Sequence, residues 1–255
     1  MIDMHSHILF GVDDGPKTKE EAIALLVQAA DEGITKIIST SHAKQPQFDV
    51  AAFLVLELVK ELQKTVKQEG IPIDIYHGHE IRIHEDLKKG LEYNELLPLA
   101  DSKYVLIELP SGQVPLYTQK VIADILSMRM VPVIAHPERN RGIMEKPERL
   151  ERLVRQGALA QVTAGSITGH FGKEVQKLAL QLIDANLVHM LGSDVHSLDT
   201  RPFLFEKSLD FLEKKRRGDD ADILLENNEC IVDNMDIELL EPETVRKKAW
   251  WQFAF

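Results

Sequence analysis

The chain has 255 residues, with 44% hydrophobic and 28% charged residues, a composition that indicates a globular protein with a sizeable core and excludes a collagenous or disordered one. Its formal net charge of -11 argues against nucleic acid as the main ligand, because binding to a phosphate backbone depends on clustered Lys and Arg. No apolar run approaches the roughly 18 residues of a membrane span. With one cysteine and no signal-like start, the chain is expected in the cytoplasm, without membrane insertion.

The first part of the chain alternates between β-like and helical patterns. After an N-terminal strand, Thr18 and Glu21 fit a capping box that opens a helical pattern, and Gly33 ends it. The β-rich run 36–40 follows, and a second helical pattern occupies residues 53–62. This order of strand, helix, strand and helix is typical of parallel βαβ units.

Further β-like runs continue the alternation. They cover residues 73–76, 104–107, 131–134, 159–162 and 187–191. Helical patterns separate most of them, and one of these begins at Pro147 and ends at Gly157. About seven βα units can be counted, so we expect an α/β barrel. Because no Pro, Gly or Ser-rich linker divides the chain, residues 1–255 are expected to form a single domain.

Polar residues recur where the β-like runs end. They are His7, His42, Glu80, Glu108, His136 and Asp194. In an α/β barrel the carboxyl ends of the strands meet on one face, which carries the catalytic groups. We therefore expect these side chains to share one basin.

The same residues have the chemistry of a metal site. His5 and His7 stand two apart after the first strand, so alternation directs both imidazoles to one face. Imidazoles with carboxylates and without thiolates suit Zn, Mn or Fe. For His136 a neutral core histidine is the alternative. The other histidines are expected in structural or surface positions: His77, His79, His84, His170 and His189.

Five segments resemble the polymerase and histidinol phosphatase (PHP) superfamily. They are 3–7 (DMHSH), 11–15 (GVDDG), 40–42 (TSH), 136–139 (HPER) and 192–196 (GSDVH). Within that superfamily, their combination is similar to the bacterial polysaccharide-associated tyrosine-protein phosphatases of the CpsB/YwqE type. The resemblance spans almost the whole chain and implies a distorted TIM-like barrel of seven βα units.

The resemblance also implies three bound divalent metal ions, with manganese favoured and iron or zinc as alternatives. It assigns the ligand positions to His5, His7, Asp14, His42, Glu80, Glu108, His136, Asp194 and His196. Asp13 stands beside Asp14, and the sequence leaves open which carboxylate turns inward. Arg139 and Arg201 correspond to arginines that hold the substrate phosphate, although Arg201 could instead lie at the surface.

The function implied by the resemblance is metal-dependent hydrolysis of phosphotyrosine on a bacterial tyrosine kinase and its targets, in capsule or exopolysaccharide synthesis. Water activated by the metal ions would attack phosphorus in line. A small-molecule phosphatase of the histidinol phosphate type, or a phosphoprotein-binding module without hydrolysis, are the alternatives. The aromatic segment 250–255 is expected to pack on the barrel, with an exposed recognition tail as the alternative.

Overall fold

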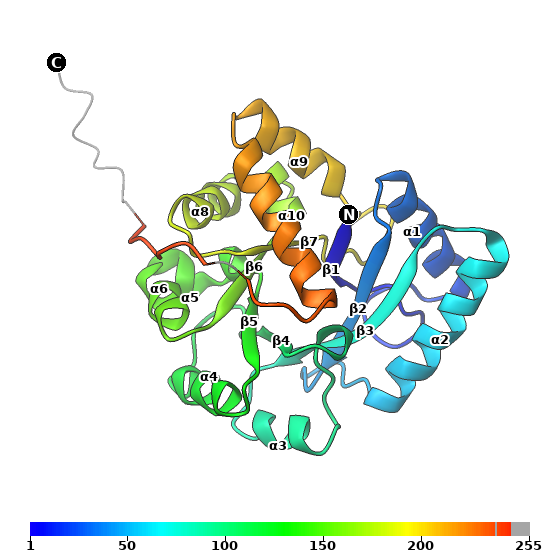
Figure 1. Ribbon diagram of the computed structural model, residues 1–255, viewed down its shortest axis with the longest axis horizontal. Helices are drawn as coiled ribbons and strands as arrows, with labels where there is room; N and C mark the ends of the chain where they lie inside the picture. The colour runs from blue at the N-terminus through cyan, green and yellow to red at the C-terminus, as the bar shows by residue number, and fades with distance from the viewer. Residues whose placement is uncertain (238, 246–255) are drawn as a thin grey trace.

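A computed structural model describes residues 1–237 and 239–245, in which seven parallel strands form a nearly closed barrel (Figure 1). The strands are β1 Ile2–Ser6, β2 Lys36–Ala43, β3 Asp74–Arg82, β4 Tyr104–Glu108, β5 Val131–Ala135, β6 Leu159–Thr163 and β7 Met190–Gly192. Each strand pairs in parallel with the next one along the chain. The predicted α/β barrel of seven units is confirmed, while the aromatic segment 250–255 lies outside the described residues.

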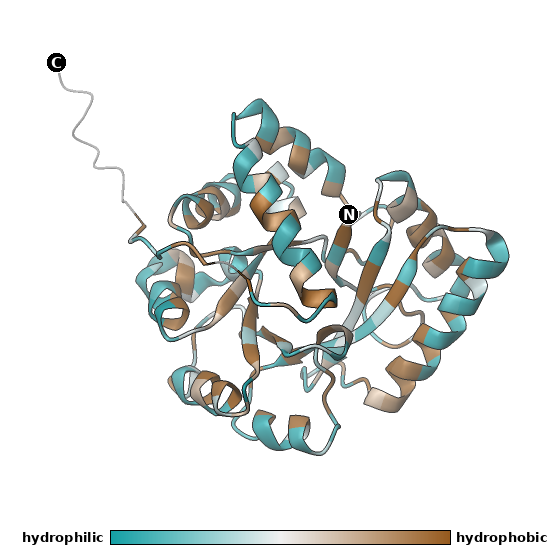
Figure 2. Ribbon diagram, viewed as in Figure 1, coloured by the Kyte–Doolittle hydropathy of each residue, from teal (hydrophilic) through white to brown (hydrophobic). Residues whose placement is uncertain are grey.

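Helices connect the strands and lie around the barrel (Figure 1). They are α1 Lys19–Asp31, α2 Ala52–Glu69, α3 Leu87–Glu92, α4 Thr118–Ser127, α5 Arg141–Glu145, α6 Glu148–Arg155, α7 Ala164–Thr168, α8 Lys173–Asp184, α9 Phe205–Lys214 and α10 Gly218–Val232, with the short 3-10 helices η1 Leu99–Asp101 and η2 Pro137–Arg139. Figure 2 shows hydrophobic colour over parts of the strands, with hydrophilic stretches in β3, and mixed colour along the helices, as expected for amphipathic helices on a buried sheet. None of the helices in the described part of the chain is long and apolar enough to span a bilayer.

Strand β3 is longer than the sequence indicated. The apolar run 73–76 covers only its beginning, and the strand continues through polar residues that include Glu80. Gly78 lies in this extension, where an added side-chain carbon would stand 3.0 Å from Leu99 Cδ2. The extension lacks an apolar pattern because its inward side carries site residues and a glycine that admits η1.

Strand β7 is shorter than the sequence indicated, because residues 187–189 precede it. The backbone N–H of His189 donates to the Ala160 carbonyl at 2.8 Å, while its ring Nδ1 accepts from the Ala160 N–H at 3.1 Å. The imidazole therefore takes the place that a backbone carbonyl would have in a regular ladder. His189 is buried at this position, and β7 begins one residue later.

The barrel closes between β1 and the residues that follow β7. A parallel bridge joins Ser6 to Val195, the His7 N–H donates to the Val195 carbonyl at 2.9 Å, and the Asp194 N–H donates to the His5 carbonyl at 2.8 Å. We call this contact the β1–β7 seam. Because β7 is short, the seam is formed largely by backbone outside the regular strand.

Helix α10 crosses the opposite, amino-terminal end of the barrel (Figure 1). The buried Asn228 side chain donates to the carbonyls of Ile2 and Leu191 at 2.8 and 2.7 Å, and accepts from the Leu191 N–H at 3.2 Å. One amide thereby holds β1 and β7 together where no ladder joins them. The Tyr104 hydroxyl donates to the Met235 carbonyl at 2.6 Å and fixes the chain beyond α10.

His189 should make the fold sensitive to acid. Burial lowers the pKa of His189 to about 4, so the folded protein keeps it neutral while the unfolded chain binds a proton below its ordinary pKa of about 6.5. Stability is then lost as the pH falls from about 6.5 to 4. His189→Gln should remove roughly 3 kcal/mol of that loss. Urea unfolding of both proteins across this pH range, with chelator present, measures it; parallel pH profiles would contradict the assignment.

Candidate metal centre

The strands carry the candidate ligands inward at regular spacing. A buried apolar cluster lies inside the barrel. It includes Met4, Ile38, Tyr104, Leu106, Val133, Leu159 and Met190. His42 lies four residues beyond Ile38 on β2, and Glu108 lies two beyond Leu106 on β4. Because strand side chains alternate with a period of two, an even spacing keeps the polar residue on the inner side. Core and site thus occupy successive layers of one barrel.

Two strands depart from this rule and use special backbone instead. In β1 the pairing register shifts between Asp3 and Ser6, an irregularity of the kind that re-aims side chains beside active sites. In β5 the ligand candidate His136 follows the strand with a left-handed backbone, φ 32° and ψ 55°. Such a conformation is rare for a residue other than glycine and is common at functional sites.

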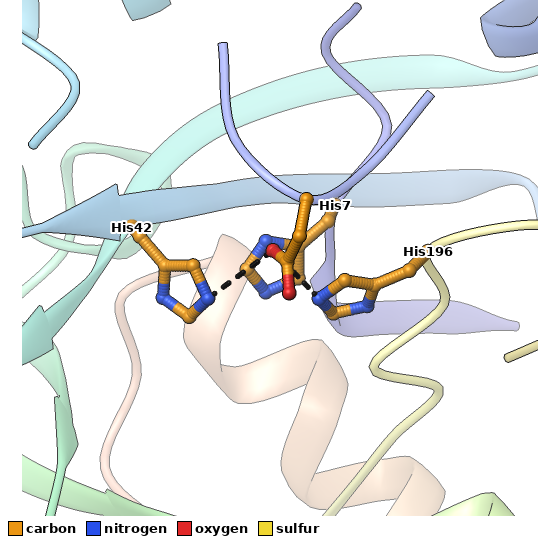
Figure 3. A group of neighbouring side chains, drawn as sticks. His7, His42 and His196 are labelled. Carbon is orange, nitrogen blue, oxygen red and sulfur yellow. Dashed lines mark ion pairs between the residues drawn. The ribbon is translucent and has the colours of Figure 1, made fainter. Parts of the chain in front are cut away.

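The candidate ligands gather in three groups whose donor atoms lie within 4.8 Å of one another. These are His7, Asp14, His42 and His196; His5, His7 and Glu80; and His42, Glu80 and Glu108. Shared members join the groups into one cluster, and Figure 3 shows the rings of His7, His42 and His196 turned toward one another.

The other two candidates adjoin this cluster. His136 Nε2 lies 2.7 Å from Glu80 Oε1, and Asp194 Oδ1 lies 3.5 Å from His5 Nε2. All nine residues named from the sequence are therefore brought together. All are buried except Asp14, whose side chain is 40% exposed.

Four imidazole nitrogens in the cluster are buried without a hydrogen-bond partner in the described structure. They are the Nε2 atoms of His5, His7 and His196 and the Nδ1 atom of His42. His7 Nε2 instead lies 3.4 Å from Glu80 Oε2, and His196 Nε2 lies 3.2 Å from Asp14 Oδ1. Buried polar atoms left unpaired are costly. Unpaired imidazoles facing carboxylates, with no thiolate near, fit a set of divalent cations.

The carboxylates give His7 and His42 a strong preference for positive charge. Burial by itself would lower the pKa of His42, but Glu80 and Asp14 outweigh it and raise that pKa to about 11. Burial would also lower the pKa of His7, but Asp13 and Glu80 outweigh it and raise that pKa to about 9. The same field that favours imidazolium favours a metal cation in its place.

The two adjacent aspartates, which the sequence could not separate, have different positions. Asp13 is buried, and its Oδ2 lies 3.0 Å from His7 Nδ1 while its Oδ1 accepts the Gly15 N–H. Asp14 is 40% exposed, and its Oδ1 lies 3.4 Å from His42 Nε2 and 3.2 Å from His196 Nε2. Asp13 therefore orients a ring, and Asp14 presents its carboxylate to the cluster.

Gln161 has a comparable role that the sequence reasoning missed. Its Oε1 lies 2.9 Å from His5 Nδ1 and accepts the His136 N–H, while its Nε2 donates to the Val162 carbonyl. The ring of His5 is thus held with Nε2 toward the cluster. The available signal was its place on β6, two residues beyond Leu159 on the inner side, where a polar residue needs a partner.

Arg82 was missed as well. It follows Glu80 by two on β3, and its Nη2 lies 2.9 Å from Glu108 Oε2. Burial and the nearby Glu80 carboxylate raise the pKa of Glu108 to about 7, which Arg82 partly offsets. The same alternation that predicted the inward side of Glu80 could have identified Arg82.

Arg139 and Arg201 lie side by side at the edge of the cluster. Arg139 Nη1 and Arg201 Nη2 both donate to Asp194 Oδ2. Burial alone would raise the pKa of Asp194, but these two guanidinium groups hold it well below its ordinary value. Each arginine side chain is about a quarter exposed, 25% and 27%, so both can meet a ligand arriving from solvent.

Aromatic rings flank this edge. The Phe48 ring lies nearly parallel to that of His42, with centroids 5.9 Å apart and an interplanar angle of 12°. On the other side, the Arg139 guanidinium carbon lies 5.0 Å from the centre of the Phe171 ring. The polar cluster therefore has apolar surface at its mouth.

The remaining histidines have partners away from the cluster. His77 lies 3.0 Å from Asp101, His84 lies 2.9 Å from the Arg82 carbonyl, and His170 lies 3.0 Å from the Thr200 carbonyl. His79 accepts from the Leu97 N–H at 3.1 Å. None of them, nor His189, belongs to the three metal-ligand groups found among the described residues.

An α/β barrel with histidines, carboxylates and arginines at the carboxyl ends of its strands has the architecture of metal-dependent hydrolases. The chain belongs to the CpsB/CapC family of capsular polysaccharide synthesis, which it matches over residues 1–233. Tyrosine-protein phosphatase YwqE of Bacillus subtilis is 38% identical to it over 99% of this chain and 100% of its own length. Tyrosine-protein phosphatase CpsB of Streptococcus pneumoniae is 33% identical over 89% and 96%.

Solved structures agree with this assignment. One described as YwqE from Bacillus subtilis and CpsB from Streptococcus pneumoniae, metal-dependent tyrosine phosphatases, matches with a TM-score of 0.94 and 38% identity, over 97% of this chain and 100% of its own. The phosphotriesterase homology protein of Escherichia coli shares the fold alone, with a TM-score of 0.53 at 13% identity over 91% and 97%. The resemblance to the CpsB/YwqE type is confirmed.

Removing Asp13 tests whether it orients His7. Asp13→Ala should weaken manganese binding by about 10 to 100-fold, because the groups that orient metal-binding histidines typically contribute that much to affinity. Calorimetric titration of chelator-treated protein with Mn²⁺ measures the affinity. Asp49→Ala, an exposed carboxylate on the next loop, is the matched control. Equal affinities in the two variants would show that the Asp13–His7 contact does not support metal binding.

Proposed function

We propose that this chain is a metal-dependent protein-tyrosine phosphatase that hydrolyses phosphotyrosine in proteins. The observation that carries the proposal is the buried cluster of imidazoles and carboxylates with unpaired nitrogens, bordered by Arg139 and Arg201. The family relationship supports the same activity, since the relatives YwqE and CpsB are tyrosine-protein phosphatases.

The ligands of the metal ions are proposed to be the nine residues of the cluster. They are His5, His7, Asp14, His42, Glu80, Glu108, His136, Asp194 and His196. Three overlapping donor groups are consistent with three ions, and manganese, or else iron or zinc, suits nitrogen and oxygen donors. When bound, such cations make water more acidic and neutralise charge on phosphoryl oxygens.

The two arginines would hold the phosphoryl group. Asp194 already fixes both guanidinium groups side by side, so a phosphate meets donors that are oriented before it binds. A planar guanidinium fork pairs with two phosphate oxygens at once. Arg139 is further held against the Phe171 ring, which limits the directions it can take.

Several features favour an aryl phosphate as substrate. The phenol of tyrosine has a pKa near 10, so its phenolate leaves more easily than an alkoxide and needs little help from a general acid. Phe48 and Phe171 offer apolar surface at the mouth of the site, where the phenyl ring of phosphotyrosine would lie.

The physiological substrate is proposed to be a bacterial tyrosine kinase and its targets in capsule or exopolysaccharide synthesis, acted on in the cytoplasm by this barrel as a single domain. Support comes from the family, whose description names capsular polysaccharide synthesis.

Metal-stripped protein should release no phosphate from a phosphotyrosine peptide, and added Mn²⁺ should restore release. His136→Ala should abolish the restored activity, and Arg139→Ala should lower kcat about 10² to 10³-fold, as loss of one transition-state donor does. His77→Ala, whose ring pairs with Asp101, should remain fully active.

Phosphate release, measured with malachite green, distinguishes a protein-tyrosine phosphatase from a small-molecule phosphatase and from a binding module. Hydrolysis by the stripped protein or by His136→Ala would refute the metallophosphatase. Faster hydrolysis of histidinol phosphate than of the peptide would indicate a small-molecule phosphatase. Binding of the peptide without any hydrolysis would indicate a binding module.

Phe48→Ala should lower kcat/KM for a phosphotyrosine peptide about 3 to 10-fold, the value of one aromatic ring contact. For the phosphoserine peptide of the same sequence it should change little, because there is no ring to contact. Phe53→Ala removes an exposed aromatic residue from α2 and serves as the control. An equal loss on both peptides would mean that Phe48 only supports His42.

A further inference from the structure

A concave surface lies outside the metal cluster. It is a groove of about 260 Å³ between the loop that follows β4 and helix α6. Val114 and Leu116 line it on the loop side, and Arg149, Arg152 and Leu153 line it on the helix side. Nothing in the catalytic proposal uses this groove.

The groove lies on the same end of the barrel as the metal cluster. Its walls include the first residue of α4, Thr118, and the first turn of α6, and in βα units the helices begin near the carboxyl ends of the strands. It is also tied to the catalytic segment. The Asn140 amide donates to the carbonyls of Pro110 and Gln113 at 2.8 and 3.1 Å, and the Arg141 N–H donates to the Ser111 carbonyl at 2.9 Å. The loop and the segment that carries His136 and Arg139 are therefore positioned together.

The groove offers apolar and cationic groups at once. Leu116 is fully exposed, at 102% of its reference area. Arg152 is exposed and has no ion pair within the described part of the chain. Arg149 donates through Nη1 to the Gly142 carbonyl, and the same atom lies 3.9 Å from the exposed Glu145 carboxylate. The Thr118 hydroxyl is buried and lacks a hydrogen-bond partner among residues 1–237 and 239–245.

This chemistry fits a peptide with acidic and apolar side chains. The chain as a whole carries a net charge of -11 and should repel acidic peptides except where cations stand free. A free arginine attracts a carboxylate, and an exposed leucine on the same groove can pack against an apolar side chain of the same peptide.

We propose that this groove binds the segment flanking the phosphotyrosine of a protein substrate, with an apolar side chain on Leu116 and an acidic side chain at Arg152 and Arg149. The inference rests on the proposed function, because it takes the phosphotyrosine to lie in the metal cluster. It assigns to the chain a preference for acidic and apolar sequence around the modified tyrosine.

Charge reversal tests the groove separately from catalysis. The substrates are phosphotyrosine peptides flanked by Glu and Leu on both sides, the same peptides with Lys in place of Glu, and phenyl phosphate. Wild-type protein should prefer the Glu peptide. Arg152→Glu should raise KM for it about tenfold, since like charges brought together at an interface are strongly unfavourable. The same variant should have a lower KM than the wild type for the Lys peptide, and it should hydrolyse phenyl phosphate as the wild type does.

Two further variants complete the experiment. Leu116→Asp should also raise KM for the Glu peptide without affecting phenyl phosphate. Lys67→Glu makes the same change of net charge on the exposed face of α2 and should leave all three substrates unaffected. Equal peptide preference in the wild type, Arg152→Glu and Lys67→Glu would refute peptide binding in the groove and leave the proposed phosphatase activity unaffected.

A complete lack of hydrolysis would bear on the proposed function and not on the groove. If no substrate is hydrolysed with any metal, the proposed function is wrong. Fluorescence anisotropy with labelled Glu and Lys peptides then still reports on the groove, because it measures binding alone. Loss of Glu-peptide binding in Arg152→Glu, with gain of Lys-peptide binding, supports the groove; unchanged binding of both peptides overturns it.

Discussion

The β1–β7 seam is the constraint on which the rest of the structure depends. His5 and His7 stand on one side of it, and Asp194 and His196 on the other, so these ligand candidates meet only if the barrel closes. The seam is held within the site by Asp3, which accepts from both the hydroxyl and the N–H of Ser193. At the amino-terminal end of the barrel, the Asn228 side chain joins the same two strands by donating to the carbonyls of Ile2 and Leu191. Folding of the barrel and assembly of the site are therefore one event.

Closure brings together charges that would otherwise be unfavourable in a protein interior. Glu80 and Asp194 are buried beside several imidazoles, and isolated carboxylates in such a place would be costly. The structure offsets this cost through mutual neutralisation: the arginines at the rim face Asp194, and the imidazoles face Glu80. The unpaired ring nitrogens that remain are the groups that divalent cations would satisfy, so one electrostatic arrangement serves stability and metal affinity together.

A second set of residues gives the site its geometry. Asp13 and Gln161 each face the Nδ1 atom of a candidate ligand, and so direct the Nε2 atom of that ring toward the cluster. Arg82 and Phe171 restrain Glu108 and Arg139 in a similar way. Sites whose ligands are oriented in advance bind and react with less reorganisation, which is why these supporting contacts matter as much as the ligands.

The sequence by itself determined the number and order of the βα units and the membership of the cluster. Both follow from local rules, the alternation of apolar runs with helical patterns and the placement of His42 or Glu108 where a β-like run ends. Only the tertiary structure decided which groups Asp13 and Asp14 each face, how far β3 and β7 extend, and that Gln161 and Arg82 contact residues of the cluster. Those outcomes depend on partners far away along the chain, such as His5 for Gln161 and Ala160 for His189. A local pattern specifies which side of a strand a residue occupies, but the partner it meets there is set by how the whole barrel closes.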